Sequence, residues 1–188
     1  MPWHPVFVVL CAIWIACELW IDRRRSGPDA RRGDDGTLRL LHLAVPGALA
    51  LAVVLSLLHA WPLPQQFAMP LFRGGIAAMA AGIALRAWSV RVLAEHFTVD
   101  VAIRPGHRLV RHGPYRLLRH PAYSGLLLTL LGFALALGDG WAWLAVALPV
   151  APAFARRIRV EEAMLREAFP DEYPDYARAT WRLLPWLW

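Results

Sequence analysis

The sequence predicts an all-α, polytopic membrane protein with about five transmembrane helices, a polar loop and a C-terminal helix on the cytoplasmic side. The first observation is composition: 58% of the 188 residues are hydrophobic and 18% are charged, which is more apolar surface than a soluble domain of this length can bury. The second is a series of apolar runs of helical length, and the third is the clustering of arginine between alternate runs. We therefore expect an integral membrane protein.

Five apolar runs supply the expected helices. The first has no basic segment before it and ends in arginines, so we expect it to remain as a membrane span and not to be a cleaved signal. A Gly-Asp-Gly turn signal alone separates the last two, which predicts an antiparallel helical hairpin. Both of these are short for a full crossing. The runs cover about residues 4–21, 38–60, 70–94, 121–138 and 140–155.

Arginine placement predicts the orientation, because cytoplasmic loops accumulate positive charge. All but one of the 20 basic residues follow the first, third or fifth run or close the third; the exception is Arg73. We therefore expect the N-terminus outside and the C-terminus in the cytoplasm of a bacterial inner or plasma membrane. The arginines lie between hydrophobic segments and do not form one polar face, so the net charge of +6 does not indicate nucleic acid.

The two cysteines indicate neither a disulfide nor a metal site. Cys11 and Cys17 lie six residues apart within the first apolar run, so they do not share one helical face. We expect both to be small buried residues.

A polar connection of unusual length joins the third and fourth runs. Residues 95–119 mix apolar side chains with Arg and His, and unstructured loops this long are uncommon in compact proteins unless they are functional. Gly106, Gly113 and Pro114 supply tight turns. We expect this loop to fold back as a lid or pocket wall; an amphipathic interfacial anchor is the simpler alternative.

The next polar feature is the heptapeptide RHPAYSG, Arg119 to Gly125, at the start of the fourth run. Pro121 suits the first turn of a helix, where its missing N–H costs nothing. Arg119 and His120 then lie just outside the helix, and Tyr123 points back into the entrance. An aromatic and cationic interface anchor would explain Tyr123 and Arg119 but not His120.

A charged stretch follows the fifth run. If residues 156–165 are helical, Arg157 and Glu161 share one face, and Glu162 faces the neighbouring arginines. A solvated, salt-bridged helix is one reading of this pattern. The other is a pair of carboxylates at the cytoplasmic mouth that compensates a cation. The second reading requires this helix and the start of the fourth run to converge on one cavity.

Two stretches of the C-terminal half resemble the isoprenylcysteine carboxyl methyltransferase family, part of a wider membrane group that includes phospholipid N-methyltransferases. The first, His107 to Gly125, reads HRLVRHGPYRLLRHPAYSG; the second, Arg157 to Pro185, reads RIRVEEAMLREAFPDEYPDYARATWRLLP. The resemblance implies that residues 1–188 form a single membrane-embedded methyltransferase domain. Variable spans occupy 1–94, and the cofactor-binding and catalytic half occupies 95–188.

The resemblance also implies S-adenosyl-L-methionine as cofactor, a lipid-like or prenylated substrate, no metal, and an active site at the cytoplasmic face. The loop encloses the cofactor, the acidic pair holds the end of the cofactor or organises the site, and two arginines lie beside the substrate carboxylate. The implied catalytic residues are Arg119, Arg157 and Glu161. The implied cofactor-binding residues are His107, Leu109, Val110, Gly113, Tyr115, His120, Pro121, Tyr123, Glu161 and Glu162.

The resemblance implies carboxyl O-methylation. An acceptor carboxylate is already a nucleophile at neutral pH, so it needs only orientation and desolvation and no general base. An amine acceptor, as in a phospholipid N-methyltransferase, would need a base such as Glu161 or His120. Two further alternatives are a membrane reductase of the sterol type that uses NADPH, and a non-enzymatic membrane sensor that retains the pocket.

Overall fold

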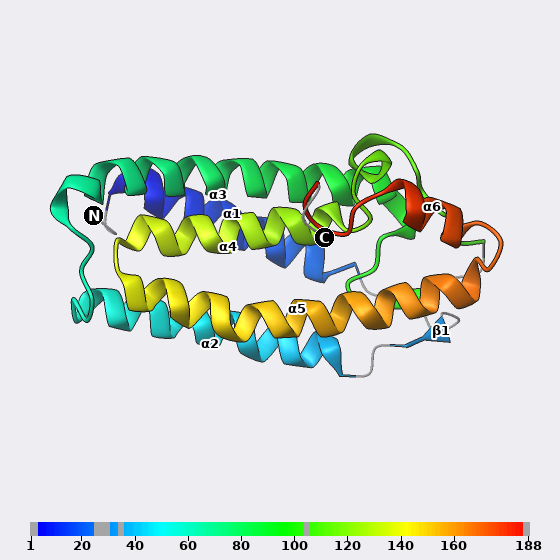
Figure 1. Ribbon diagram of the computed structural model, residues 1–188, viewed down its shortest axis with the longest axis horizontal. Helices are drawn as coiled ribbons and strands as arrows, with labels where there is room; N and C mark the ends of the chain where they lie inside the picture. The colour runs from blue at the N-terminus through cyan, green and yellow to red at the C-terminus, as the bar shows by residue number, and fades with distance from the viewer. Residues whose placement is uncertain (1–3, 25–30, 34–35, 104–105, 186–188) are drawn as a thin grey trace.

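The structure is a computed structural model that describes residues 4–24, 31–33, 36–103 and 106–185. Long helices dominate it and lie side by side along the longest axis of the molecule (Figure 1), which confirms the predicted all-α class. The short elements all lie at one end of this bundle. The long helices are α1 (Pro5–Asp22), α2 (Thr37–Leu57), α3 (Gln65–Leu93), α4 (Pro121–Leu137) and α5 (Gly140–Ala168).

The short elements build the polar end of the molecule. Two two-residue strands pair in antiparallel fashion, with Arg31 opposite Ile103 and Arg32 opposite Ala102. They tie the connection between α1 and α2 to the long loop before α4. The short elements are β1 (Arg31–Arg32), η1 (Ala94–His96), β2 (Ala102–Ile103), η2 (Gly113–Arg116) and α6 (Tyr173–Ala179).

Three helices are long and apolar enough to cross a membrane: α1, α2 and α3 with its 3₁₀ extension. The fourth, α4, is apolar but has 17 residues, or roughly 25 Å at about 1.5 Å per residue, somewhat less than a hydrocarbon core of about 30 Å. Its predicted shortness is confirmed. The connections without arginine, 58–64 and 138–139, lie at the end of the bundle opposite the polar elements (Figure 1).

Two predicted boundaries are wrong. Helix α3 begins at Gln65, five residues before the expected start, and contains Pro70. Helix α5 does not end at residue 155 but runs on to Ala168 through the charged stretch. Hydropathy falls at Arg156, yet no glycine or proline follows to stop the helix, so the apolar and the charged segments form one continuous rod.

The predicted hairpin between α4 and α5 is confirmed. Gly138 ends α4 in the left-handed conformation, with φ +70°, and Asp139 caps α5 by accepting a hydrogen bond from Ala142 N at 3.0 Å. The other carboxylate oxygen of Asp139 accepts one from Trp61 N at 2.9 Å. The hairpin is therefore latched to the connection between α2 and α3.

Helices α3 and α4 approach each other closely along a glycine seam. A Cβ at Gly82 would lie 2.5 Å from the Gly125 carbonyl oxygen, and a Cβ at Gly75 would lie 2.6 Å from that of Gly132. Small residues that permit such backbone contact are the usual means of packing helices in a membrane. The seam fixes the position of the α4 N-terminus, where RHPAYSG lies.

The C-terminal segment folds back onto the same place. Arg119 N donates to Trp181 O at 2.7 Å, and His120 N donates to Arg182 O at 3.0 Å. Ser124 Oγ donates to Leu183 O at 2.6 Å. The glycine seam and the C-terminal segment therefore both hold the start of α4 in place.

Candidate active site

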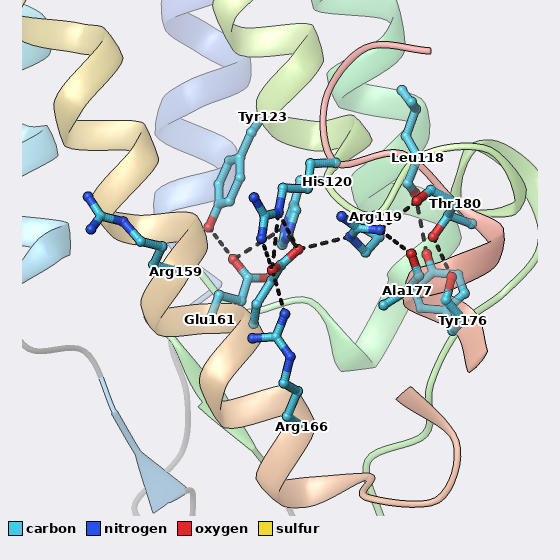
Figure 2. A network of polar contacts seen from close by, with 12 residues as sticks. Leu118, Arg119, His120, Tyr123, Arg159, Glu161, Arg166, Tyr176, Ala177 and Thr180 are labelled. Atoms are coloured by element: carbon cyan, nitrogen blue, oxygen red, sulfur yellow. Dashed lines mark hydrogen bonds and ion pairs between the residues drawn. The ribbon is translucent and has the colours of Figure 1, made fainter. Parts of the chain in front are cut away.

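The start of α4 and the charged half of α5 converge, as the site prediction requires. Tyr123 OH donates to Glu161 Oε2 at 2.6 Å, and Arg157 Nε donates to Tyr123 OH at 2.8 Å. Figure 2 shows the Tyr123 ring reaching across to Glu161. A tyrosine, a carboxylate and a guanidinium therefore form one chain of polar contacts between two helices.

Histidine 120 lies next to this chain at the N-cap of α4 and is 3% exposed. Its ring stacks on Tyr123 with 5.5 Å between the centroids and 13° between the planes. Nδ1 lies 3.8 Å from Glu161 Oε2, and Nε2 lies 3.6 Å from Glu162 Oε1. Both distances exceed that of a hydrogen bond, and within the described residues the buried Nε2 has no hydrogen-bond partner. The imidazole therefore lies between the carboxylates of Glu161 and Glu162.

The two adjacent glutamates have different surroundings. The side chain of Glu161 is 31% exposed, while that of Glu162 is 1% exposed. Glu162 accepts hydrogen bonds from three guanidinium groups: those of Arg119 at 2.8 Å, Arg166 at 3.0 Å and Arg182 at 3.1 Å. Burial by itself raises the pKa of the Glu162 carboxyl, but the His120 ring and these arginines outweigh it and hold the pKa well below its usual range.

The two predicted catalytic arginines are extensively bound by the protein. Arg119, whose side chain is 11% exposed, also donates to the carbonyl oxygens of Ala177 and Thr180 (Figure 2). Arg157, which is 2% exposed, donates to Thr37 Oγ1 at 3.1 Å and to the carbonyl of Val99. Arg119 therefore joins α5 to the C-terminal segment, and Arg157 joins α5 to α2 and the long loop.

A cavity of about 700 Å³ lies against these side chains. Volumes of this size hold drug-sized or nucleoside-sized ligands. One part is apolar and formed by the spans, with Trp14, Leu49 and Phe133 among its walls. The other part is polar and is formed by the long loop, the start of α4 and the charged half of α5, with His107 and Tyr123 among its walls. We call the part lined by the spans the apolar arm and the part lined by the loop the polar arm.

Two aromatic features extend the polar arm. The His107 ring lies 5.1 Å from the His96 ring and 5.9 Å from the Phe169 ring, measured between centroids. Tyr176 OH donates to Tyr115 O at 2.9 Å, and burial with the Glu161 charge raises the pKa of Tyr115 well above its usual value. The phenol of Tyr115 therefore stays neutral.

Nine of the twelve predicted site residues line the cavity, and three do not. Three of them do not line the cavity: Glu162 is buried among arginines, Pro121 is buried in the first turn of α4, and Gly113 turns against Val92 of α3 with φ +59°. The others line it: His107, Leu109, Val110, Tyr115, Arg119, His120, Tyr123, Arg157 and Glu161. Their roles stay predictions.

Sequence reasoning missed the contribution of the N-terminal spans. Glu18 of α1 and Arg86 of α3 face the same cavity and form an ion pair, with 2.5 Å between Arg86 Nε and Glu18 Oε1. A charged residue inside an apolar run is itself a signal of function. That signal was present in the first and third runs.

Comparison with known proteins agrees with this geometry. Residues 71–172, more than half of the chain, match the family model described as phospholipid methyltransferase. A probable protein-S-isoprenylcysteine O-methyltransferase from Oryza sativa subsp. indica is 33% identical over 115 residues, which cover 60% of each chain. The cobalt-zinc-cadmium resistance protein CzcN of Cupriavidus metallidurans is 43% identical over 88 residues, which cover 45% of this chain and 38% of that protein.

The fold also matches a solved structure. The eukaryotic intramembrane Ras methyltransferase ICMT (isoprenylcysteine carboxyl methyltransferase) superposes with a TM-score of 0.66 at 19% identity, covering 98% of this chain and 69% of that chain. The resemblance predicted from the two C-terminal stretches is confirmed. The chain spans about 60% of the length of the rice relative.

Proposed function

The chain belongs to the phospholipid methyltransferase family, and we propose that it transfers a methyl group from S-adenosylmethionine to the carboxylate of a lipid-like or prenylated acceptor. The observation that carries this proposal is a continuous cavity whose polar arm lies beside Glu161 and whose apolar arm lies between the spans. The names of relatives as protein-S-isoprenylcysteine O-methyltransferases support the choice of a carboxylate.

The polar arm has the donor set that this cofactor needs. When bound, S-adenosylmethionine supplies an electrophilic methyl group together with an ammonium, a carboxylate and an adenine. The partly exposed carboxylate of Glu161 suits the ammonium. The rings of His96, His107 and Tyr115, which all line the cavity, suit a flat aromatic group. The residues proposed to hold the cofactor are His107, Leu109, Val110, Tyr115, His120, Tyr123 and Glu161.

The polar chain keeps the site rigid. Tyr123 OH donates to Glu161 and accepts from Arg157, so each group orients the next. We propose that Glu161 is thereby held as a carboxylate that faces the cavity, with Arg157 and Arg119 supplying compensating positive charge. Glu162, Gly113 and Pro121 act indirectly, by holding the arginines, the loop and the start of α4 in place.

The acceptor needs orientation more than activation. A carboxylate is ionised at neutral pH, so the protein has only to strip its water and align it. The apolar arm suits an acyl or prenyl chain that enters from the bilayer, and the polar arm suits a water-soluble cofactor. We propose that the polar end faces the cytoplasm, because the arginines cluster there.

A second candidate is N-methylation of a phospholipid amine, which the description of the matching family favours. An amine must lose a proton before it attacks, and His120 between two carboxylates is the group that would accept it. The two reactions leave chemically different products: a carboxylate acceptor gives a methyl ester, and an amine acceptor gives an N-methylated amine.

Cofactor binding tests the proposal first. In detergent, S-adenosylhomocysteine is expected to raise the unfolding temperature of the purified protein and NADPH is not. Glu161→Gln should weaken S-adenosylhomocysteine binding by at least about tenfold, because a charge-assisted hydrogen bond to the ammonium is lost.

Glu167→Gln is the matched control on the same helix, since Glu167 does not line the cavity, and it should bind as the unchanged protein does. Stabilisation by NADPH instead of S-adenosylhomocysteine would contradict the proposal and favour a reductase. Equal affinity in Glu161→Gln would remove Glu161 from the cofactor site.

A further inference from the structure

The Glu18 and Arg86 ion pair is a polar feature of the cavity that the C-terminal site does not explain. Arg86 Nε donates to Glu18 Oε1 at 2.5 Å, and Nη2 donates to Oε2 at 2.7 Å, a bidentate arrangement. The two side chains come from α1 and α3, within apolar helices, and both line the cavity. Ionisable groups at such places are costly and are usually functional.

Stability does not explain the pair. Replacing a buried ion pair by apolar side chains is often neutral or stabilising, because both charges lose their hydration. The side chains are also not fully enclosed: Arg86 is 11% exposed and Glu18 is 29% exposed. This exposed area belongs to the wall of the cavity, so the pair is available to a ligand there.

The hydrogen bonds that Glu18 and Arg86 already make indicate which kind of ligand the pair can bind. Both oxygens of Glu18 are used, since Oε1 also accepts from Trp14 Nε1 at 3.3 Å. Arg86 uses Nε, Nη2 and, toward Ala122 O at 3.2 Å, Nη1. A guanidinium has five N–H groups, so among the described residues two remain without a protein acceptor. The pair can donate further but has little capacity to accept.

The position of Arg86 relative to the proposed site is also suitable. Its Nη1 bonds to Ala122 O, and the next residue is Tyr123, which holds Glu161. Arg86 therefore lies against the first turn of α4, beside the polar residues of the proposed site.

We infer that Arg86, oriented by Glu18, binds the anionic headgroup of the lipid-like acceptor and so selects a carboxylate over a neutral or cationic group. This inference rests on the proposed function and adds a specificity residue to it. Arg86 provides the two free N–H groups, and Glu18 fixes the plane of the guanidinium and balances its charge when no acceptor is bound.

The test compares two acceptor analogues by direct binding. N-acetyl-S-farnesylcysteine carries the carboxylate, and its carboxamide differs only at that group. Binding to the full chain in detergent is followed by tryptophan fluorescence, since Trp14 lines the cavity. The unchanged protein should bind the carboxylate at least about tenfold more tightly than the amide, the usual effect of a charged hydrogen bond.

The variants separate recognition from structure. Arg86→Gln should abolish the preference for the carboxylate, while Glu18→Gln should bind the carboxylate more tightly because a competing anion is removed. If the pair were purely structural, both variants would lose the same affinity for the carboxylate and for the amide. Arg73→Gln is the matched control, since Arg73 is an exposed residue of α3 away from the cavity. If Arg86→Gln does not fold, the double variant Glu18→Gln with Arg86→Met replaces it.

A carboxylate preference that survives in Arg86→Gln or in the double variant would overturn the inference. So would tighter binding of S-farnesylcysteamine, an amine, than of the carboxylate. These measurements need no turnover. Failure of methyl transfer with an intact Arg86-dependent preference would therefore count against the proposed reaction only.

Discussion

At the scale of single residues, the adjacent glutamates Glu161 and Glu162 of α5 lie in different surroundings. Glu161 faces the cavity with one hydrogen bond from Tyr123, and Glu162 is enclosed by Arg119, Arg166 and Arg182. Successive residues of a helix point about 100° apart, so one turns toward the ligand space and the other toward the C-terminal segment. The first is suited to binding and the second to holding the site together.

The Glu162 cluster predicts a specific loss of stability. Glu162→Gln should lower the free energy of unfolding by about 3–5 kcal/mol, because the mostly enclosed Arg119 loses its counter-charge. Thermal unfolding in detergent measures it. Glu172→Gln is the control: the Glu172 side chain is 61% exposed in its pair with Arg111, and exposed pairs contribute at most about 1 kcal/mol. Equal stability of Glu162→Gln would contradict a structural role.

The same carboxylate predicts the direction of the pH dependence. Its pKa is lower in the folded than in the unfolded state, so its contribution is fully present above the unfolded value of about 4.3. It is lost as pH falls below that value. Stability from Glu162 should therefore be constant between about pH 8 and 5 and decrease under more acidic conditions. A smaller acid-induced decrease in Glu162→Gln than in the unchanged protein is the expected comparison.

At the scale of helices, the glycine seam between α3 and α4 sets where RHPAYSG lies. A Cβ at Gly82 would come within 2.6 Å of Thr129 N and 2.5 Å of Gly125 O, both backbone atoms. Backbone cannot move aside as a flexible side chain can, so any substitution must separate the helices. The sequence gives small residues in both runs, but which glycines face each other follows only from the helix pairing.

Gly82→Ala tests the seam. It should lower the free energy of unfolding by about 1–3 kcal/mol through overpacking and should weaken S-adenosylhomocysteine binding, because the start of α4 is displaced. Gly74→Ala on the same helix meets nothing within 4 Å and should be neutral or slightly stabilising, as alanine favours a helix over glycine. The midpoint of thermal unfolding distinguishes them. Similar midpoints would show that the seam tolerates a methyl group.

Hydropathy accounts for how much of each element could be predicted. It located the apolar runs because a bilayer selects for them directly, and the Gly-Asp-Gly signal located the hairpin. It misplaced the end of the last helix, since α5 continues to Ala168 after the apolar part stops. An average of hydrophobicity does not detect a helix that leaves the membrane and stays a helix.

At the scale of the whole molecule, the site belongs to both halves of the chain. The C-terminal motifs supply the polar arm, as the family resemblance implied. Much of the apolar arm, together with the Glu18 and Arg86 pair, comes from spans outside the two C-terminal stretches that carried the resemblance. Their convergence depends on tertiary packing of α1 against α3, of α3 against α4 and of α2 against α5. Sequence patterns therefore located the residues of the polar arm better than those of the apolar arm.

If one cavity brings S-adenosylmethionine and a lipid carboxylate together, the transferred methyl group becomes a methyl ester, and the chemical form of the labelled product shows whether it does. Purified protein is incubated with methyl-labelled S-adenosylmethionine and N-acetyl-S-farnesylcysteine, and the labelled lipid is treated with base. We expect label that base releases as methanol, the mark of a methyl ester, and much less label with Glu161→Gln. Base-stable label, or undiminished transfer by Glu161→Gln, would contradict this expectation.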